Sequence, residues 1–181
     1  MTLDLTQIKR LLEIRGRERY TGEPVSHFEH ACQTATFAQR SGATPSLMAA
    51  ALLHDIGHLL SGLGSTPSAQ GHNDRHEAIA ADALSHLFAP DVTEPIRLHV
   101  AAKRRLCVDA WYLRALSEDS LRSLSLQGGA FSPEEAAAFD ATQHAVAALQ
   151  LRRWDDAAKR SGFALGSLDE YWGPVVETAL R

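Results

Sequence analysis

Hydrophobic residues recur along the chain at helical intervals. Leu5, Ile8, Leu11 and Leu12 are spaced three or four residues apart after an acidic start, which is typical of an amphipathic helix that extends to Ile14. No segment shows the strict alternation of hydrophobic and polar residues that marks a half-buried strand. The pattern therefore predicts an all-α fold.

Glycine, proline and capping residues divide the rest of the chain. Residues 16–26 contain Gly22 and Pro24 and are expected to form a loop. Further helices are predicted from capping residues and first-turn prolines, over residues 26–39, 45–60, 74–88, 90–103, 133–159 (with interruptions) and 167–180. Residues 108–127 predict short helices. Residues 61–73 are rich in glycine and serine and predict a loop that is a candidate lid.

Length and charge narrow the class of protein. The chain has 181 residues and shows neither a repeat nor a linker, so we expect a single domain over residues 1–181. A net charge of −4 argues against non-specific binding to nucleic acid or to an anionic membrane. We expect no membrane helix and no signal peptide. We expect Cys32 and Cys107 to be free thiols, which indicates a reducing, cytoplasmic location.

An adjacent imidazole and carboxylate, His54 and Asp55, directly follow a run of apolar residues that extends from Ala49 to Leu53. Buried polar groups must be paired, and a metal ion pairs them well. Taken alone, such a dipeptide belongs more often to an ordinary helix surface or helix end.

Further potential ligands occur once per predicted helix. His30 precedes the pair, His76 and His99 follow on the next two helices, and Asp155 lies much later. Metal sites in helical bundles are built from one or two side chains on each of several helices. Each histidine alone is more commonly a solvated or satisfied core residue, but the ordered set predicts a metal site.

This order of residues resembles the HD-domain superfamily, which His30, His54-Asp55 and Asp155 match, and the additional histidines resemble its dinuclear members. The resemblance implies an HD-domain helical bundle with a metal-site core over about residues 20–159. It implies that His30, His54 and Asp155 hold one metal, that His76 and His99 hold a second, and that Asp55 bridges the two. Imidazole and carboxylate ligands without thiolate suit iron, with manganese, cobalt or zinc also possible by chemistry alone.

The surrounding residues, from about Tyr20 to Lys159, resemble the phosphonate-cleaving, mixed-valent diiron oxygenases of this superfamily, which are related to myo-inositol oxygenase. The resemblance implies that Tyr20 caps an iron site when substrate is absent and that Glu23 binds the ammonium group of the substrate. It also implies that His58, one turn after His54, donates a hydrogen bond to the substrate or to a metal-bound oxygen. Tyr20 and His58 are therefore the expected catalytic residues.

Four more residues match the phosphonate-binding positions of that family: Lys103, Ser123, Gln127 and Arg152. Two cations and several neutral donors suit a tetrahedral dianion, although each residue alone is more often a solvated charge or a helix cap. Ser125 replaces Ser123 if the local helix register differs. Lys159 also matches a family position, as a partner of the Asp155 carboxylate four residues earlier.

The resemblance implies an O2-dependent cleavage of the carbon–phosphorus bond of a 1-hydroxy-2-aminoethylphosphonate-like substrate, releasing phosphate and glycine. The implied cofactors are two iron ions in a mixed-valent Fe(II)/Fe(III) pair, with O2 as co-substrate. The expected partner is a small organophosphonate, with no nucleic acid or membrane, bound by a monomer or small homo-oligomer. Three alternatives stay open: a phosphohydrolase acting on a phosphate ester or nucleotide, a non-catalytic module that binds a nucleotide or a protein, and a related oxygenase with an altered substrate, for instance one with a trimethylated amine or a shorter phosphonate.

Overall fold

The regular secondary structure of the protein is helical. The computed structural model describes residues 3–20, 22–63 and 67–180, and no β-strand forms within these ranges. Two isolated bridges pair Arg19 with Ser26 and Phe88 with Ala179. The prediction of an all-α fold is thus confirmed.

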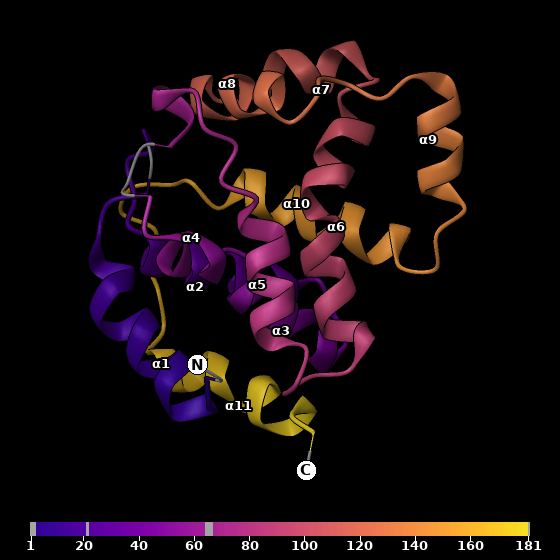
Figure 1. Ribbon diagram of the computed structural model, residues 1–181. Helices are drawn as coiled ribbons and strands as arrows, with labels where there is room; N and C mark the ends of the chain where they lie inside the picture. The colour runs from indigo at the N-terminus through magenta and orange to yellow at the C-terminus, as the bar shows by residue number, and fades with distance from the viewer. Residues whose placement is uncertain (1–2, 21, 64–66, 181) are drawn as a thin grey trace.

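The helices follow one another along the chain and fold into one bundle (Figure 1). Their bounds are α1 Leu5–Ile14, α2 His27–Arg40, α3 Pro45–Leu53, α4 Ile56–Ser61, α5 His76–Leu84, α6 Pro90–Leu106, α7 Ala110–Ala115, α8 Glu118–Leu126, α9 Pro133–Asp140, α10 Ala145–Ala157 and α11 Leu168–Thr178. Two short 3₁₀ helices, η1 (Arg15–Arg17) and η2 (Ser68–Gln70), lie between them. None of the described helices is both long and apolar enough to cross a membrane.

Local sequence fixes where many of these helices begin. The hydroxyls of Ser26 and Ser132 each accept a hydrogen bond from the backbone N–H of the third helical residue, and the glutamate side chain at that position accepts one from the backbone N–H of the cap residue. Such reciprocal capping satisfies backbone N–H groups that have no partner within the helix. Pro45 and Pro133 stand at first positions, where a proline costs no hydrogen bond.

The prediction of one helix over residues 45–60 was wrong, because the chain breaks at His54-Asp55. Helix α3 ends at Leu53, and Asp55 caps α4 with φ −101° and ψ 8°, outside the helical region. Gly57 then packs directly on the start of α5: a Cβ atom there would lie 2.0 Å from the carbonyl oxygen of His76. Only glycine allows this approach, which brings the break beside the next histidine.

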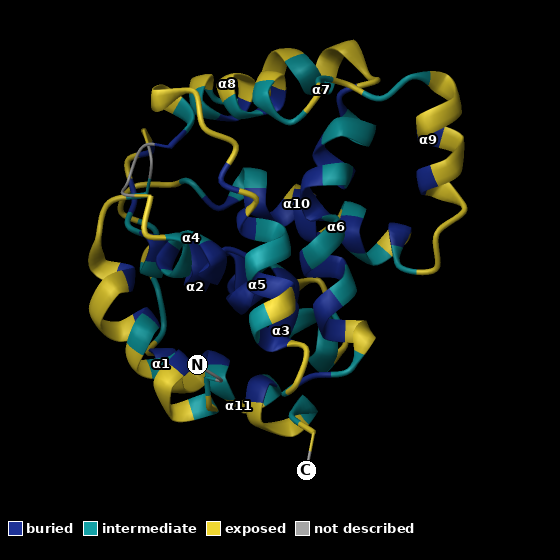
Figure 2. Ribbon diagram, in the orientation of Figure 1, coloured by how far each residue is buried: buried dark blue, intermediate teal, exposed yellow. Residues whose placement is uncertain are grey.

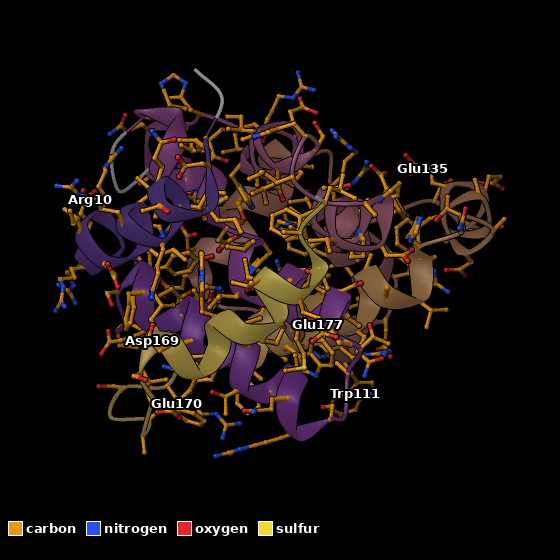
Figure 3. All side chains as sticks on the ribbon, turned by 90° about the horizontal axis from the view of Figure 1, so that it is seen from below. Arg10, Trp111, Glu135, Asp169, Glu170 and Glu177 are labelled. Atoms are coloured by element: carbon orange, nitrogen blue, oxygen red, sulfur yellow. The ribbon has the colours of Figure 1, made fainter. Side chains whose placement is uncertain are left out.

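Helix α3 forms the centre of the core. Its residues Ala49 to Leu53 are at most 1% exposed, and α2, α6, α10 and α11 pack around it. Figure 2 shows buried residues concentrated in these central helices, with exposed residues on α1, α9 and α11. In the view from below, the labelled side chains of Arg10, Asp169 and Glu177 lie on the outside of the molecule (Figure 3). Helices α7 and α8 form a separate layer at the top of Figure 1, where α8 contacts η2.

Candidate metal centre

Six histidine and aspartate side chains converge inside the bundle as two clusters. The ligand atoms of one cluster (His30, His54 and Asp155) lie within 4.8 Å of one another, as do those of the other (Asp55, His76 and His99). All six residues are buried. They come from α2, the α3–α4 break, α5, α6 and α10, so the structure brings together every metal ligand that the sequence suggested.

The distances within each cluster fit a shared cation. In the first, the Nε2 atom of His30 lies 3.2 Å from that of His54 and 3.3 Å from Oδ1 of Asp155. In the second, the Nε2 atoms of His76 and His99 are 3.1 Å apart. Ligands bound about 2.1 Å from one ion are separated by roughly 3.0–3.4 Å.

The Asp55 carboxylate lies between the two clusters. Its Oδ2 atom is 3.4 Å from Nε2 of His30, on the side of the first cluster. Its Oδ1 atom is 3.6 Å from Nε2 of both His76 and His99, and 3.4 Å from Nε2 of His54. This is the placement that a bridging carboxylate requires.

Hydrogen bonds at the far side of each imidazole fix which nitrogen carries the proton. The Nδ1 atoms of His30, His54 and His99 contact the carbonyl oxygens of Ala158, Ala51 and Ile96 at 2.7–3.0 Å. A carbonyl oxygen only accepts, so each Nδ1 is the donor and each Nε2 presents a lone pair to the cluster. Facing lone pairs repel one another unless a cation lies between them.

The buried carboxylates of the two clusters also need a cation beside them. Among the described residues, Oδ1 of Asp55 and Oδ1 of Asp155 are buried without a hydrogen-bond partner. Burial lowers the pKa of His30, but Asp155 and Asp55 outweigh burial and raise it to about 9. Positive charge is therefore favoured at this point, and a metal ion would supply it in place of a second proton on His30. The donor set fits a pair of cations.

Asp74 is a functional residue that the sequence analysis missed. Oδ1 of its buried carboxylate accepts a hydrogen bond from Nδ1 of His76 (2.8 Å), and Oδ2 lies at ion-pair distance (2.6 Å) from Nδ1 of His58. Burial raises the pKa of Asp74, but these two histidines hold it well below its usual range. Arg75, which lies between Asp74 and His76 in the sequence, adopts a left-handed conformation (φ 51°) that is unfavourable for a non-glycine residue. The carboxylate thus orients one ligand and the histidine beside it.

Tyr20 closes the site above the first cluster. Its hydroxyl donates to Oδ2 of Asp55 (2.7 Å), and its ring stacks on His30 with centroids 4.4 Å apart. Burial, followed by the Asp55 charge, raises its pKa well above the usual value, so the phenol is neutral. His27, which received no role from the sequence, packs edge-on against Tyr20, and burial and His58 lower its pKa to about 3.

A cavity of about 40 Å³ adjoins the second cluster. The four predicted phosphonate-binding residues line it together with Tyr20, His58, Asp74, His76, His99, Asp155 and Lys159. Ser123 faces the cavity, whereas Ser125 is exposed and donates to the Leu121 carbonyl oxygen, so the Ser123 register is the one formed. The predicted lid loop contributes Pro67, Ser68, His72 and Asn73, and its residues 64–66 lie outside the described residues.

Inside this cavity the two predicted cations have different partners. The Arg152 guanidinium pairs with Asp155 (2.8 Å) and with Asp156. The Lys103 ammonium donates to the Ser123 hydroxyl (2.8 Å). The Oε1 atom of Gln127 is buried without a partner among the described residues.

Glu23 occupies a different position from the other predicted substrate-binding residues. It is 8% exposed and is not part of the cavity wall. It accepts a hydrogen bond from the Ser117 hydroxyl (2.6 Å) and lies 3.1 Å from the Lys159 ammonium. Lys159 therefore contacts Glu23, and not the Asp155 carboxylate that the sequence analysis paired with it.

Comparison with known proteins identifies the class. The HD domain family matches residues 27–141, a span that contains every ligand of the two clusters except Asp155. The match covers more than half of the chain, so the protein belongs to the HD-domain family.

More similar relatives place it within that family. The hydroxymethylphosphonate dioxygenase of Gimesia maris is 42% identical over 92% of this chain and 84% of its own length. The glycine-betaine-forming [1-hydroxy-2-(trimethylamino)ethyl]phosphonate dioxygenase of Leisingera caerulea is 38% identical over 92% and 85%. An uncharacterised protein of Acanthamoeba polyphaga mimivirus is 33% identical over 96% and 81%. The chain is an O2-dependent oxygenase of the group that contains the first two relatives.

Proposed function

We propose that this oxygenase cleaves the carbon–phosphorus bond of a 1-hydroxyphosphonate. The observation that carries the proposal is Lys103, whose side chain is a buried cation (2% exposed) with no carboxylate partner among the described residues. Burial, and then the charge of Arg152, lower its pKa to about 7. A bound dianion supplies the missing negative charge, in a cavity that His76 and His99 also line.

The neighbours of Lys103 complete a site for a tetrahedral anion. Arg152 keeps N–H groups beyond those bound to Asp155 and Asp156, and the Ser123 hydroxyl and the Gln127 amide add neutral donors. Charge-assisted hydrogen bonds from lysine and arginine to a phosphonate are the stronger part of this recognition.

The metal ligands would be those that converge in the two clusters. His30, His54 and Asp155 would hold one iron ion, His76 and His99 would hold the second, and Asp55 would contact both. A mixed-valent Fe(II)/Fe(III) pair, when bound, would supply the activation of O2 and the one-electron chemistry that a carbon–phosphorus bond requires.

The reaction balances with O2 as the sole oxidant. A 1-hydroxyphosphonate and O2 give a carboxylate, inorganic phosphate and one proton. One C–H bond and the C–P bond of the same carbon break, that carbon loses four electrons, and O2 takes them up. Hydroxymethylphosphonate would give formate, and 1-hydroxy-2-aminoethylphosphonate, the substrate that the sequence suggested, would give glycine.

The side chains around the clusters position the substrate and move its protons. The Tyr20 hydroxyl lies on Asp55, where the substrate hydroxyl would displace it. Nδ1 of His58 lies 2.6 Å from the Asp74 carboxylate, and Nε2 of the same ring lies 3.9 Å from Oδ2 of Asp55, where the substrate hydroxyl would displace Tyr20. With its proton on Nδ1, this histidine would accept the proton of the substrate hydroxyl at Nε2, whereas the sequence suggested that it donates a hydrogen bond.

One assay tests this function. Iron-loaded protein would be given hydroxymethylphosphonate, 1-hydroxy-2-aminoethylphosphonate, p-nitrophenyl phosphate and a nucleotide, with and without O2, and phosphate release would be measured. We expect release from a hydroxyphosphonate only when O2 is present. Hydrolysis of the phosphate ester or nucleotide without O2 would refute the proposal and favour the phosphohydrolase alternative.

A further inference from the structure

We propose that Lys159 determines the charge that the substrate can carry, by occupying the position on Glu23 that a substrate ammonium would need. The inference rests on the proposed function. It predicts that the preferred substrate is a short 1-hydroxyphosphonate without an amine.

Glu23 already has a cation at one of its carboxylate oxygens. Its Oε1 atom receives the Ser117 hydroxyl at 2.6 Å and lies 3.1 Å from Nζ of Lys159. The carboxylate side chain is 7% exposed. Lys159 is thus the internal counter-ion of this buried charge.

Lys159 stands between Glu23 and the cavity. It lines the cavity wall, whereas Glu23 does not. Its ammonium also donates to the Ser120 hydroxyl (3.2 Å) and lies 5.8 Å from the centroid of the Tyr20 ring. A ligand at this end of the cavity therefore meets a positive group, and the negative group lies behind it.

An aminated substrate faces two obstacles here. Its ammonium would approach the Lys159 ammonium, and like charges repel strongly where little water is present. Alternatively it would displace Lys159 from Glu23, which leaves a lysine that is only 13% exposed without its partner. A substrate without an amine avoids both and still meets Lys103 and Arg152 at its phosphonate.

The test compares kcat/KM for hydroxymethylphosphonate and 1-hydroxy-2-aminoethylphosphonate in iron-loaded protein, by phosphate release. In the unmodified enzyme we expect hydroxymethylphosphonate to be preferred by about tenfold or more. Lys159→Met frees the Glu23 carboxylate, so the specificity ratio should shift toward the aminated substrate by about tenfold or more. Adding Glu23→Gln to Lys159→Met should abolish that shift, because the charge that attracts the ammonium is gone.

Two controls keep the outcomes apart. Lys9→Met removes a lysine that pairs with Asp169 outside the cavity, and it should leave the ratio as it was. If Lys159→Met fails to fold, the inhibition of the unmodified enzyme by ethylphosphonate is compared with its inhibition by 2-aminoethylphosphonate. Ethylphosphonate should inhibit at about tenfold lower concentration.

The two proposals fail in different ways. If neither hydroxyphosphonate releases phosphate, the proposed function is wrong. If the unmodified enzyme uses the aminated substrate equally well or better, or if 2-aminoethylphosphonate is the stronger inhibitor, the function stands and the role of Lys159 is refuted.

Discussion

Replacing Asp74 should weaken metal binding at the second cluster without unfolding the protein. Its carboxylate receives Nδ1–H of His76 at 2.8 Å, which orients Nε2 toward His99 and Asp55. A hydrogen bond to a charged group contributes about 1.5–3 kcal/mol, which corresponds to roughly 10- to 150-fold in affinity. Loss of an outer partner of a ligating histidine typically costs about 10- to 100-fold in affinity or activity. Asp74→Ala should therefore lower the affinity for the second metal by about this factor.

Asp74→Asn separates the two histidines that share the carboxylate. The amide oxygen can accept from only one Nδ1–H, and its NH2 group then faces the other imidazole. If the oxygen turns to His76, the second metal is retained, while His58 is forced to carry its proton on Nε2 and loses its acceptor there. We expect near-normal metal content with kcat lowered by at least about tenfold.

The measurements are metals per chain after dialysis against a graded chelator, circular dichroism for folding, and steady-state kinetics. If both variants kept two metals with unchanged affinity and the same kcat, Asp74 would orient neither histidine, and the tautomer argument for the second cluster would be refuted.

Other perturbations test separate parts of the structure. Lys103→Met should raise the KM for the phosphonate by at least about tenfold, because it removes a charge-assisted bond, and an unchanged KM would exclude this lysine from the binding site. The Lys103 ammonium has a pKa lowered to about 7, so its charged form is present below that pH; the KM should rise as the pH increases from 7 to 9, and Lys103→Arg should remove that rise. Gly57→Ala should lower the stability by about 1–3 kcal/mol or more and reduce metal content, because its Cβ would lie 2.0 Å from the His76 carbonyl oxygen. Equal melting temperatures of Gly57→Ala and the unmodified protein would contradict the close approach of α4 to α5.

The convergence of the six histidine and aspartate side chains could be predicted from the sequence because the chain carries potential ligands on several successive helices. Lys103 and Arg152 were suggested by the family resemblance, and their spacings of four and three residues from His99 and Asp155 place them on the same helix faces as those residues. The break at His54-Asp55 could not be predicted, because apolar residues continue the helical pattern on both sides. It depends on the contact of Gly57 with His76, which only the folded chain reveals.

Two other features depend equally on tertiary structure. Asp74 reaches His76 because Arg75 adopts a left-handed conformation, which the residue type does not suggest. The family resemblance assigned Lys159 to Asp155, four residues earlier, a spacing that places both on one face only in a continuous helix, but α10 ends at Ala157. The lysine thus leaves the helix face and reaches Glu23, far away in the sequence.

The early end of α10 couples the geometry of the candidate metal centre to the charge next to Glu23. Within five residues it supplies the predicted metal ligand Asp155, the Ala158 carbonyl oxygen that orients His30, and the Lys159 charge that covers Glu23. Selection for a new substrate that reshapes this turn should therefore also disturb the metal-binding cluster. Diversification of substrate charge in such enzymes should proceed by single side-chain exchange at the lysine, and insertions or deletions in this turn should be poorly tolerated.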